Sequence, residues 1–409
     1  MKFLCEAIPA CPGQFKSQRE DFRVEELPLY PFSGQGDHTL VLIEKEGLST
    51  FEAVRRLSRA LDFNDRDVGV AGLKDAHGIT RQWLSFEHMP PARFEGLDVA
   101  KVRVIQTTRH NNKLKRGHLA GNRFEVVLRD VAEADVPHAK ASLALLQQRG
   151  VPNWYDTQRF GRGGNNATLG LAILRGDYDA YFRAMLGNAD AETHGPLKEA
   201  RKAYDDGNLD QALELWPRHD NVERGALKAV KDFGPTDKAL RRVPQKIKLL
   251  QVSSVQSLLF NRVLERRFGD LDKVWDGDIC EKENGACFLV ADPAVEQPRV
   301  ETFEISPTGP IFGFKMMQPF GRTAELEREV LQAEGLTETS FEVGKGLSQK
   351  GDRRALRFRI RDTALSYAAD ERALTLRFDL PKGCYATIVL REITRQGESL
   401  TLPAHGAAE

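Results

Sequence analysis

The first 130 residues of the chain contain short apolar runs separated by polar segments, a pattern typical of strands joined by turns. One segment differs, because its apolar residues recur at helical spacing. This spacing predicts a helix over residues 51–61, which Ser49 or Thr50 can cap. The apolar density and β-branched content elsewhere predict four strands, over residues 38–45, 68–73, 79–86 and 124–128.

Beyond residue 130 the pattern becomes more helical. Residues 136–149 predict a helix, with Pro137 in its first turn and Gly150 directly after its end. Residues 168–265 are also largely helical in pattern, and they contain no repeated copies of a motif that would predict a solenoid. The remaining predictions, in chain order, are short strands over 270–360 with one helix near 324–333, a strand, turn and second strand or helix over 374–393, and an unstructured terminus.

This succession of elements predicts an α+β protein. Strands and helices alternate in the first 130 residues without the long crossovers that join parallel strands, so we expect an antiparallel or mixed sheet. The segment VPNWYDTQRFGRGGNN is rich in glycine and asparagine and is typical of a structured loop. It predicts a domain boundary near residue 151.

The composition is that of an ordinary globular protein with about two domains. The chain has 409 residues with 59 basic and 59 acidic side chains, and hydrophobic residues make up 41% of it. Because the total charge is neutral, any surface that binds nucleic acid must be a local basic patch that is balanced by acidic residues elsewhere.

Several classes of protein are excluded or disfavoured. No apolar run reaches the roughly 18 residues that a membrane span needs, and Glu6 and Pro9 interrupt the apolar start, which makes a poor signal peptide. Five cysteines without zinc-site spacing predict reduced thiols, no metal site and a cytoplasmic protein. No exposed heptad pattern or apolar stripe stands out, so we expect a monomer.

Asp75 is the sharpest local candidate for chemistry. It lies in the polar turn KDAHG between two predicted strands, where a carboxylate is partly solvated and partly enclosed by a sheet. Its neighbours Lys74, His77 and Arg81 could stabilise the ionised form. An ionised, positioned aspartate can act as a nucleophile or general base, although aspartate is also common in turns because it bonds nearby backbone amides.

Residues 101–130 carry a local excess of positive charge. Eight basic side chains, among them Lys113, Lys115 and Arg116, stand against two acidic ones. Such a segment in a neutral chain is the expected electrostatic footprint of binding to a phosphate backbone. A solvated loop is the alternative, because most charge runs are solvated surface.

Aromatic residues beside polar ones form a third group of candidates, which includes Phe22, Phe124 and Tyr385. Aromatic faces stack on unstacked bases, and an asparagine amide can read a base edge, whereas core packing is the alternative for each ring. The glycines of FGRGGNN belong neither to GxxxxGK[ST] nor to a GxGxxG that follows a strand. We therefore expect no nucleotide cofactor.

Taken in order, the segments of this chain resemble those of the TruD-type tRNA pseudouridine synthases. The most specific are AGLKD followed closely by TRQW, and a PN-aromatic segment that ends in QRFG. The resemblance is good over residues 13–130, 151–165, 250–265 and 375–393, and weak over about 168–247 and 270–372. The matching segments are EDFRVEELP, HTLVLIEKEGLST, AGLKDAHGITRQWLS, KLKRGHLAGNRFEVVLR, VPNWYDTQRFGRGG, SVQSLLFNRVL and FDLPKGCYATIVLRE.

The resemblance implies both an activity and a fold. Members of the family are isomerases that convert a specific uridine of tRNA to pseudouridine, typically at position 13 of the D arm, with no metal and no organic cofactor. The implied fold is a pseudouridine-synthase catalytic core with a mixed or antiparallel sheet, made of residues 1–150 and 359–409. An inserted α/β TRUD domain would occupy residues 151–358, and the expected partner is tRNA.

The resemblance also implies roles for individual residues. Asp75 falls on the position of the family's nucleophile, and Lys16 on that of a basic residue that could partner the aspartate or a phosphate. The implied substrate-binding residues are Phe22, Asn122, Phe124 and Tyr385. Relatives often have phenylalanine at the last position, so the tyrosine keeps the stacking face and adds a hydroxyl.

Two alternatives stay open. An RNA-binding or RNA-chaperone protein with the same fold and no catalysis would explain the basic segment, but it would be free to lose Asp75 and Asn122, which this chain has. A glycosidase or nuclease with two carboxylates would need Asp62, Asp65 or Asp67 in one cleft with Asp75, and nothing in the sequence places them there.

Overall fold

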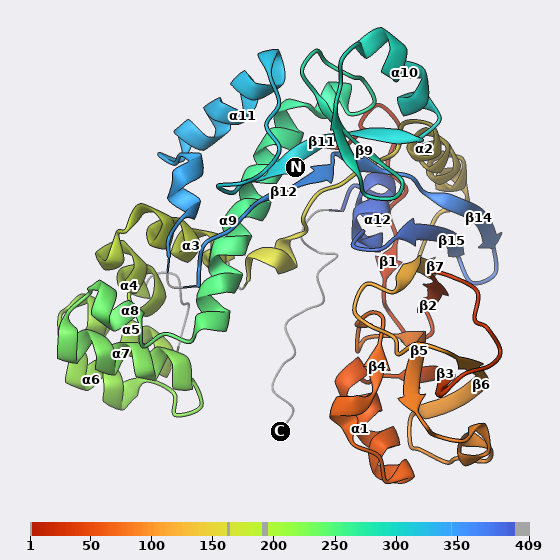
Figure 1. The fold of residues 1–409 in the computed structure, drawn as a ribbon, viewed down its shortest axis with the longest axis horizontal. Coiled ribbons are helices and arrows are strands. Elements are labelled where there is room, and N and C mark those ends of the chain that lie inside the picture. The colour runs from red at the N-terminus through yellow and green to blue at the C-terminus, as the bar shows by residue number, and fades with distance from the viewer. Residues whose placement is uncertain (1, 162–163, 190–194, 345, 397–409) are drawn as a thin grey trace. The chain divides into compact units, whose positions relative to one another are not determined.

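The computed structural model describes residues 2–161, 164–189, 195–344 and 346–396, and the chain divides into two units. Unit 1 consists of Met1–Val151 and Phe358–Glu409, and unit 2 of Pro152–Arg357. Unit 1 therefore combines both end segments of the chain, which are red to orange and blue in Figure 1. The predicted unstructured terminus lies outside the described residues from position 397 onward.

A mixed sheet of nine strands forms the body of unit 1. Its strands are β1 (Gln14–Phe15), β2 (Phe22–Pro28), β3 (His38–Glu46), β4 (Gly69–Val70), β5 (Ile79–Glu87), β6 (Val102–His110), β7 (Leu119–Arg129), β14 (Arg361–Ala368) and β15 (Ala373–Pro381). They are ordered β14-β15-β7-β2-β5-β3-β6, with β1 beside β7 and β4 beside β5. Because β2 and β5 are parallel and the other neighbours within the described residues are antiparallel, the predicted α+β fold with a mixed sheet is confirmed.

The strand predicted over residues 68–73 is largely wrong, since only Gly69–Val70 pairs with a neighbour. The backbone beyond it bonds to loops instead. The carbonyl oxygen of Ala71 accepts a hydrogen bond from the N–H of Gly117, and the N–H of Lys74 donates to the hydroxyl of Thr50. The chain thus leaves the sheet early and forms the loop that precedes β5.

The described residues of unit 1 include the helices α1 (Thr50–Leu61), α2 (Val136–Arg149) and α12 (Ala386–Thr394). The hydroxyl of Ser49 accepts a hydrogen bond from the N–H of Glu52, so Ser49 caps α1 as predicted. The apolar face of α1 packs on one face of the sheet. The carboxylate of Glu392 in α12 accepts hydrogen bonds of 3.0 Å from the N–H groups of Leu4 and Cys5, which fixes the two end segments of the chain together.

Unit 2 combines helices with a small antiparallel sheet, and its core lies mainly between the helices. The helices are α3 (Asn165–Arg175), α4 (Tyr178–Leu186), α5 (Pro196–Asp205), α6 (Leu209–Leu215), α7 (Asn221–Phe233), α8 (Asp237–Leu240), α9 (Gln245–Arg266), α10 (Pro293–Glu301) and α11 (Gly321–Ala333). The strands pair in the order β10 (Cys287–Leu289), β9 (Ile279–Lys282), β11 (Ile305–Ile311) and β12 (Asp352–Ala355). Two short strands, β8 (Val151–Pro152) and β13 (Arg357–Phe358), contain the residues where the chain passes between units. Within the described ranges no helix is both long and apolar enough to cross a membrane.

Candidate active site

Asp75 lies in the loop between β4 and β5, and 54% of its side chain is exposed. Two backbone features hold this loop in place. The N–H of Lys74 donates a 2.9 Å hydrogen bond to Oγ1 of Thr50 at the start of α1. Gly78 has a φ of 129°, and a Cβ atom there would collide with the main-chain oxygen of Phe22, so the position requires glycine. The carboxylate is therefore accessible on a loop that is fixed by its neighbours.

The ammonium group of Lys16 pairs directly with Asp75, at 3.4 Å from Nζ to Oδ2, and the Lys16 side chain is only 11% exposed. Lys16 directly follows β1 and has a φ of 58°, a left-handed backbone conformation that is uncommon outside glycine. Its Nζ also lies 4.2 Å from the centroid of the Phe22 ring, which is a cation–π contact. A carboxylate, a cation and an aromatic ring thus meet at one place.

The cations expected beside Asp75 from the sequence are engaged elsewhere. Nζ of Lys74 lies 2.6 Å from Oε2 of Glu26, and both side chains are buried. Nε of Arg81 lies 2.9 Å from Oε2 of Glu44. Lys74 and Arg81, which we expected to stabilise the ionised form of Asp75, instead form ion pairs with acidic side chains that β2 and β3 place next to them.

Lys45 is a residue of the site that the sequence analysis did not identify. Its ammonium group, on a side chain that is almost fully buried, donates hydrogen bonds to the main-chain oxygens of Leu48 and Asp75. Burial lowers the pKa of Lys45 to about 8, although the nearby Asp75 acts in the opposite direction. The only signal in the sequence is a lysine at the end of an apolar strand, which is also the pattern of an ordinary solvated strand end.

The aromatic candidates Phe22 and Phe124 are neighbours on the adjacent strands β2 and β7. Their ring centroids are 6.1 Å apart, and Phe124 also contacts Phe378 of β15 at 5.7 Å. Both candidate rings are buried, with 6% and 7% of their surface exposed. The sheet therefore gives these rings a fixed position, and Lys16 lies over the first of them.

Asn122 lies on β7, opposite Glu26 of β2 and Leu380 of β15. Its side-chain oxygen Oδ1 is buried and has no hydrogen-bond partner among the described residues. A buried acceptor without a donor is costly, so this oxygen is available to accept a hydrogen bond. Glu26, its cross-strand neighbour, holds Lys74, which directly precedes Asp75.

Tyr385 directly precedes α12 and is half-buried, after the turn that follows β15. In this turn, the N–H of Lys382 donates to the main-chain oxygen of Ala120 and its ammonium group to that of Gly117. The turn therefore adjoins the end of β7 that carries Asn122. Lys16, by contrast, follows the short strand that pairs with the opposite end of β7.

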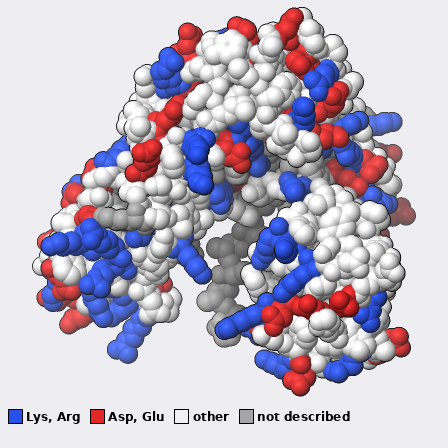
Figure 2. All heavy atoms as spheres, viewed as in Figure 1, with Lys and Arg blue, Asp and Glu red and all other residues white. Residues whose placement is uncertain are grey.

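The basic segment 101–130 is not one continuous patch. Several of its cations are neutralised by acidic residues outside the segment, in ion pairs of 2.7 Å that join Arg103 to Glu44, Arg123 to Asp379 and Arg129 to Asp21. Figure 2 accordingly shows blue and red side chains intermixed on the visible surface. The whole segment therefore does not form one phosphate-binding patch, and only its remaining cations stay candidates for contact with phosphates.

Lys113, Lys115 and Arg116 lie in the loop 111–118 between β6 and β7, which we call the basic loop. The second and third of these side chains are exposed, and the guanidinium of Arg116 lies 5.7 Å from the ring of Phe51. The N–H of Gly117 donates a 2.9 Å hydrogen bond to the main-chain oxygen of Ala71. The basic loop thus adjoins the segment that leads to Asp75.

This arrangement combines an accessible carboxylate, an adjacent ammonium group, aromatic rings and a buried amide oxygen that needs a donor. Such groups suit nucleophilic attack on a planar, hydrogen-bonding ring system that an RNA phosphate backbone accompanies. Among the described residues, no cluster of three or more His, Cys, Asp and Glu side chains could hold a metal ion.

Comparison with known proteins shows which family the chain resembles along its length. The family model described as "tRNA pseudouridine synthase D (TruD)" matches residues 1–393. The chain is 45% identical to the tRNA pseudouridine synthase D of Geobacter metallireducens over 398 residues, which cover 97% of this chain and 98% of that protein. It is 36% identical to the protein of the same name from Anaeromyxobacter dehalogenans, with 98% of each chain covered.

A solved structure whose description names the same family has a fold similar to that of this chain. The crystal structure of the putative tRNA pseudouridine synthase D (TruD) from Methanosarcina mazei is similar to this chain with a TM-score of 0.84 and 25% sequence identity. The match covers 97% of this chain and 96% of that one. The family resemblance drawn from the ordered segments is confirmed.

Proposed function

The chain belongs to the TruD family of tRNA pseudouridine synthases and is thus an isomerase, and we propose that it acts on uridine 13 of the tRNA D arm with Asp75 as its nucleophile. The observation that carries this proposal is the half-exposed Asp75 carboxylate, 3.4 Å from the ammonium of Lys16 on a fixed loop. The cation lies beside a carboxylate that must react in its ionised form.

The substrate has to change shape before the reaction. The target base lies in a stack, so the enzyme extrudes the nucleotide at a cost of a few kcal/mol. Stacking on an aromatic ring returns about 1–3 kcal/mol per base. The candidate rings are Phe22, which lies under the ammonium of Lys16, and its neighbour Phe124. Stacking tolerates rotation of the base in its plane better than hydrogen bonds do, which suits a reaction that turns the base.

The reaction then proceeds as an intramolecular transfer. The Asp75 carboxylate attacks either the ribose or the pyrimidine ring, and the glycosidic bond to nitrogen 1 breaks. The base rotates, carbon 5 bonds to the sugar, and the bond to Asp75 breaks. The proton on carbon 5 leaves to a base, and nitrogen 1 takes up a proton. No atom is gained or lost between substrate and product, so the residues need only position, stabilise and move a proton.

The remaining residues bind the substrate in this proposal. The unpartnered Oδ1 of Asn122 accepts a hydrogen bond from the N–H edge of the uracil ring. Tyr385 supplies a further ring beside the end of β7, and the cations of the basic loop contact RNA phosphates. Residues 1–150 and 359–409 then form the catalytic core, and residues 151–358 the inserted TRUD domain.

The test is detection of the product and its position. Purified protein is incubated with an unmodified tRNA transcript, and pseudouridine is located by carbodiimide labelling and mass spectrometry. We expect one modified position, uridine 13, with the wild type and with Asp65→Asn, which changes an exposed control carboxylate of unit 1. Asp75→Asn should make no pseudouridine but still bind tRNA.

Each other result changes the proposal in a defined way. Near-normal turnover by Asp75→Asn would show that Asp75 is not the nucleophile. Modification at another uridine would correct the target, whereas tight binding without product from the wild type would favour the non-catalytic RNA-binding protein.

A further inference from the structure

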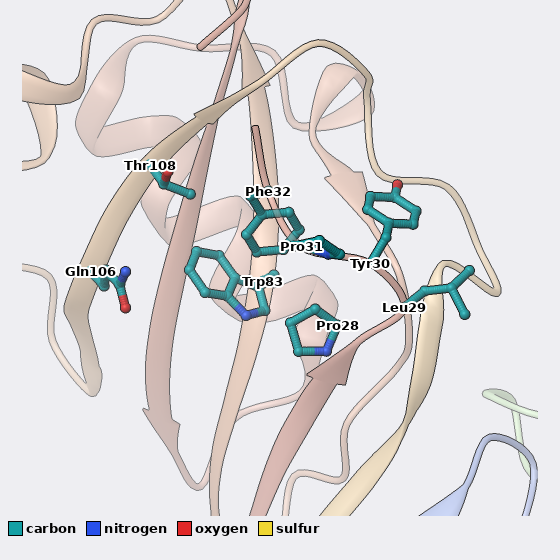
Figure 3. A pocket seen from close by; sticks show the side chains of 8 residues that line it. All are labelled: Pro28, Leu29, Tyr30, Pro31, Phe32, Trp83, Gln106 and Thr108. Atoms are coloured by element: carbon teal, nitrogen blue, oxygen red, sulfur yellow. The ribbon is translucent and has the colours of Figure 1, made fainter. Parts of the chain in front are cut away.

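A pocket with a volume of about 490 Å³ lies on unit 1 at the end of β2. Figure 3 shows Phe32 and Trp83 at its centre, Tyr30 at one side and the polar side chains of Gln106 and Thr108 on the facing strand. Ligand pockets usually have volumes of about 300–1,000 Å³, so this one has room for a nucleoside.

The strands place the pocket on the face of the sheet opposite α1. On β5, Leu84 packs toward α1, and its neighbour Trp83 points to the other face. A β-bulge on β6 adjusts the alternation, because Ile43 pairs with Val104 but the preceding residue of β3 pairs with Gln106. Val104 therefore packs in the α1 core while Gln106 and Thr108 line the pocket.

The aromatic side of the pocket is held rigidly. The rings of Phe32 and Trp83 meet edge to face with centroids 4.7 Å apart. Tyr30 stacks on His110 at 5.3 Å, and its hydroxyl lies 3.1 Å from Nδ1 of His118. A fixed aromatic wall loses little conformational freedom when a flat ligand binds against it.

We infer that this pocket binds an unpaired nucleotide of the tRNA other than the target uridine. The inference rests on the proposed function, and it adds a second contact with the same substrate. A base would lie against the wall formed by Tyr30, Phe32 and Trp83. The Gln106 amide, which both donates and accepts, and the Thr108 hydroxyl would then bond to its edge.

The charge around the pocket fits a nucleotide. Leu114 of the basic loop packs against Trp83, and His118 at the end of the same loop contacts Tyr30. The exposed side chain of Lys115 thus belongs to the loop that borders the pocket, where the phosphates of a bound nucleotide need cations.

The pocket is also connected to the Asp75 site. Oε1 of Glu26 accepts a 3.2 Å hydrogen bond from the backbone N–H of Trp83, and Oε2 pairs with Lys74, the residue before Asp75. One buried carboxylate therefore contacts both the strand that lines the pocket and the loop that carries the nucleophile. A tRNA held at both places would bind more tightly than one held at the Asp75 site alone.

The first test separates binding from chemistry. The double variant Gln106→Ala, Thr108→Val should raise the Kd for tRNA about tenfold, as expected for one or two lost hydrogen bonds, with little change in kcat at saturating tRNA. Thr107→Val is the matched control, because it lies on the same strand between the two and does not line the pocket. An unchanged Kd and KM in the folded double variant would overturn the inference.

The second test uses the wild-type protein, so it does not depend on a variant that folds. Transcripts containing photoreactive 4-thiouridine or 6-thioguanosine are cross-linked, and the adducts are located by mass spectrometry. We expect an adduct on Tyr30, Phe32 or Trp83 that persists when the target uridine is replaced by cytidine. Adducts confined elsewhere in the chain, with both transcripts, would overturn the inference.

These binding readouts remain valid whether or not pseudouridine forms. If the wild type made no pseudouridine, only the proposed function would be contradicted. Wild-type product together with unchanged binding in the double variant would contradict the pocket alone. The inference would also fail if a peptide, rather than RNA, occupied the pocket and covered its aromatic side chains.

Discussion

The ammonium group of Lys45 donates a 2.8 Å hydrogen bond to the main-chain oxygen of Asp75. The same group donates to the main-chain oxygen of Leu48, so one buried side chain joins the end of β3 to the loop that carries the proposed nucleophile. Lys45 contacts the backbone of this loop. We therefore regard it as a positioning residue, which determines where the carboxylate points.

Replacement of Lys45 should therefore lower the rate and leave binding intact. We expect Lys45→Met to reduce kcat for pseudouridine formation about 10- to 100-fold, because a small displacement of a reacting group is costly. The Kd for tRNA should stay near that of the wild type. Lys140→Met, at an exposed lysine of α2, is the control, and a raised Kd with unchanged kcat would contradict the positioning role.

The lowered pKa of Lys45 also predicts a pH dependence of stability. Its pKa is about 8 in the folded protein and near 10.5 when solvated, so the unfolded chain binds more protons between these values. The contribution of Lys45 to the free energy of unfolding should therefore increase as the pH rises from about 8 to about 10. Thermal unfolding at several pH values should show the wild type gaining stability relative to Lys45→Met over this range, and a constant difference would contradict the prediction.

Removal of only one member of the buried ion pair between Lys74 and Glu26 should destabilise the folded protein. Lys74→Met leaves a buried carboxylate without its cation, which we expect to lower the free energy of unfolding by about 3–5 kcal/mol. Burial already raises the pKa of Glu26 and Lys74 opposes this, so the loss should be smaller at low pH, where Glu26 takes up a proton. Urea unfolding measures both effects.

A double-mutant cycle controls for the loss of the side chain itself. The double variant Glu26→Leu, Lys74→Met should be more stable than the sum of the single losses predicts, since it leaves no unpaired charge. If the losses of stability in the two single variants simply added up in the double variant, the interaction between Glu26 and Lys74 would contribute nothing to the free energy of unfolding.

Asn122 should show opposite effects on stability and activity. Its buried oxygen has no partner among the described residues, so Asn122→Ala should leave the free energy of unfolding unchanged or raise it by up to about 1 kcal/mol. The same change should reduce kcat/KM roughly 10- to 100-fold, since the bond to the base edge is lost. A parallel loss of stability would instead indicate that the amide supports the fold.

The candidate site could be predicted from the sequence only through the order of its motifs. That order brought Asp75 and Lys16 together as candidates, and the structure places them in contact. The pairing of Lys74 with Glu26 could not be predicted, because it depends on the parallel neighbours β2 and β5, which bring together residues far apart in the chain.

The sequence analysis missed β2 and β6, each for its own physical reason. On β2 buried and exposed side chains alternate, but Glu26 is charged and lies on the buried face, so hydrophobicity alone does not reveal the alternation. On β6 the bulge and the many exposed residues conceal the period. Conversely, the apolar run 68–73 predicted a strand although most of it bonds to loops.

The basic loop offers the clearest test of which cations contact RNA. Lys115 and Arg116 are exposed, whereas Arg103 is 68% exposed but already lies 2.7 Å from a carboxylate oxygen of Glu44. Release of counterions from phosphates makes binding salt-dependent, and each lost phosphate contact reduces the slope of log K against log salt by about 0.7–0.9. A cation that is paired within the protein contributes less to this release, because its charge is already balanced.

We therefore expect Lys115→Gln, Arg116→Gln to weaken tRNA binding about tenfold at moderate salt and to lower the salt slope by about one to two. Arg103→Gln, which removes a cation from the same segment of sequence, should change the slope much less. Filter binding over a series of salt concentrations measures both variants against the wild type. Equal slopes for all three proteins would remove the basic loop from the RNA interface, and a larger effect of Arg103→Gln would move that interface to the edge of the sheet formed by β6.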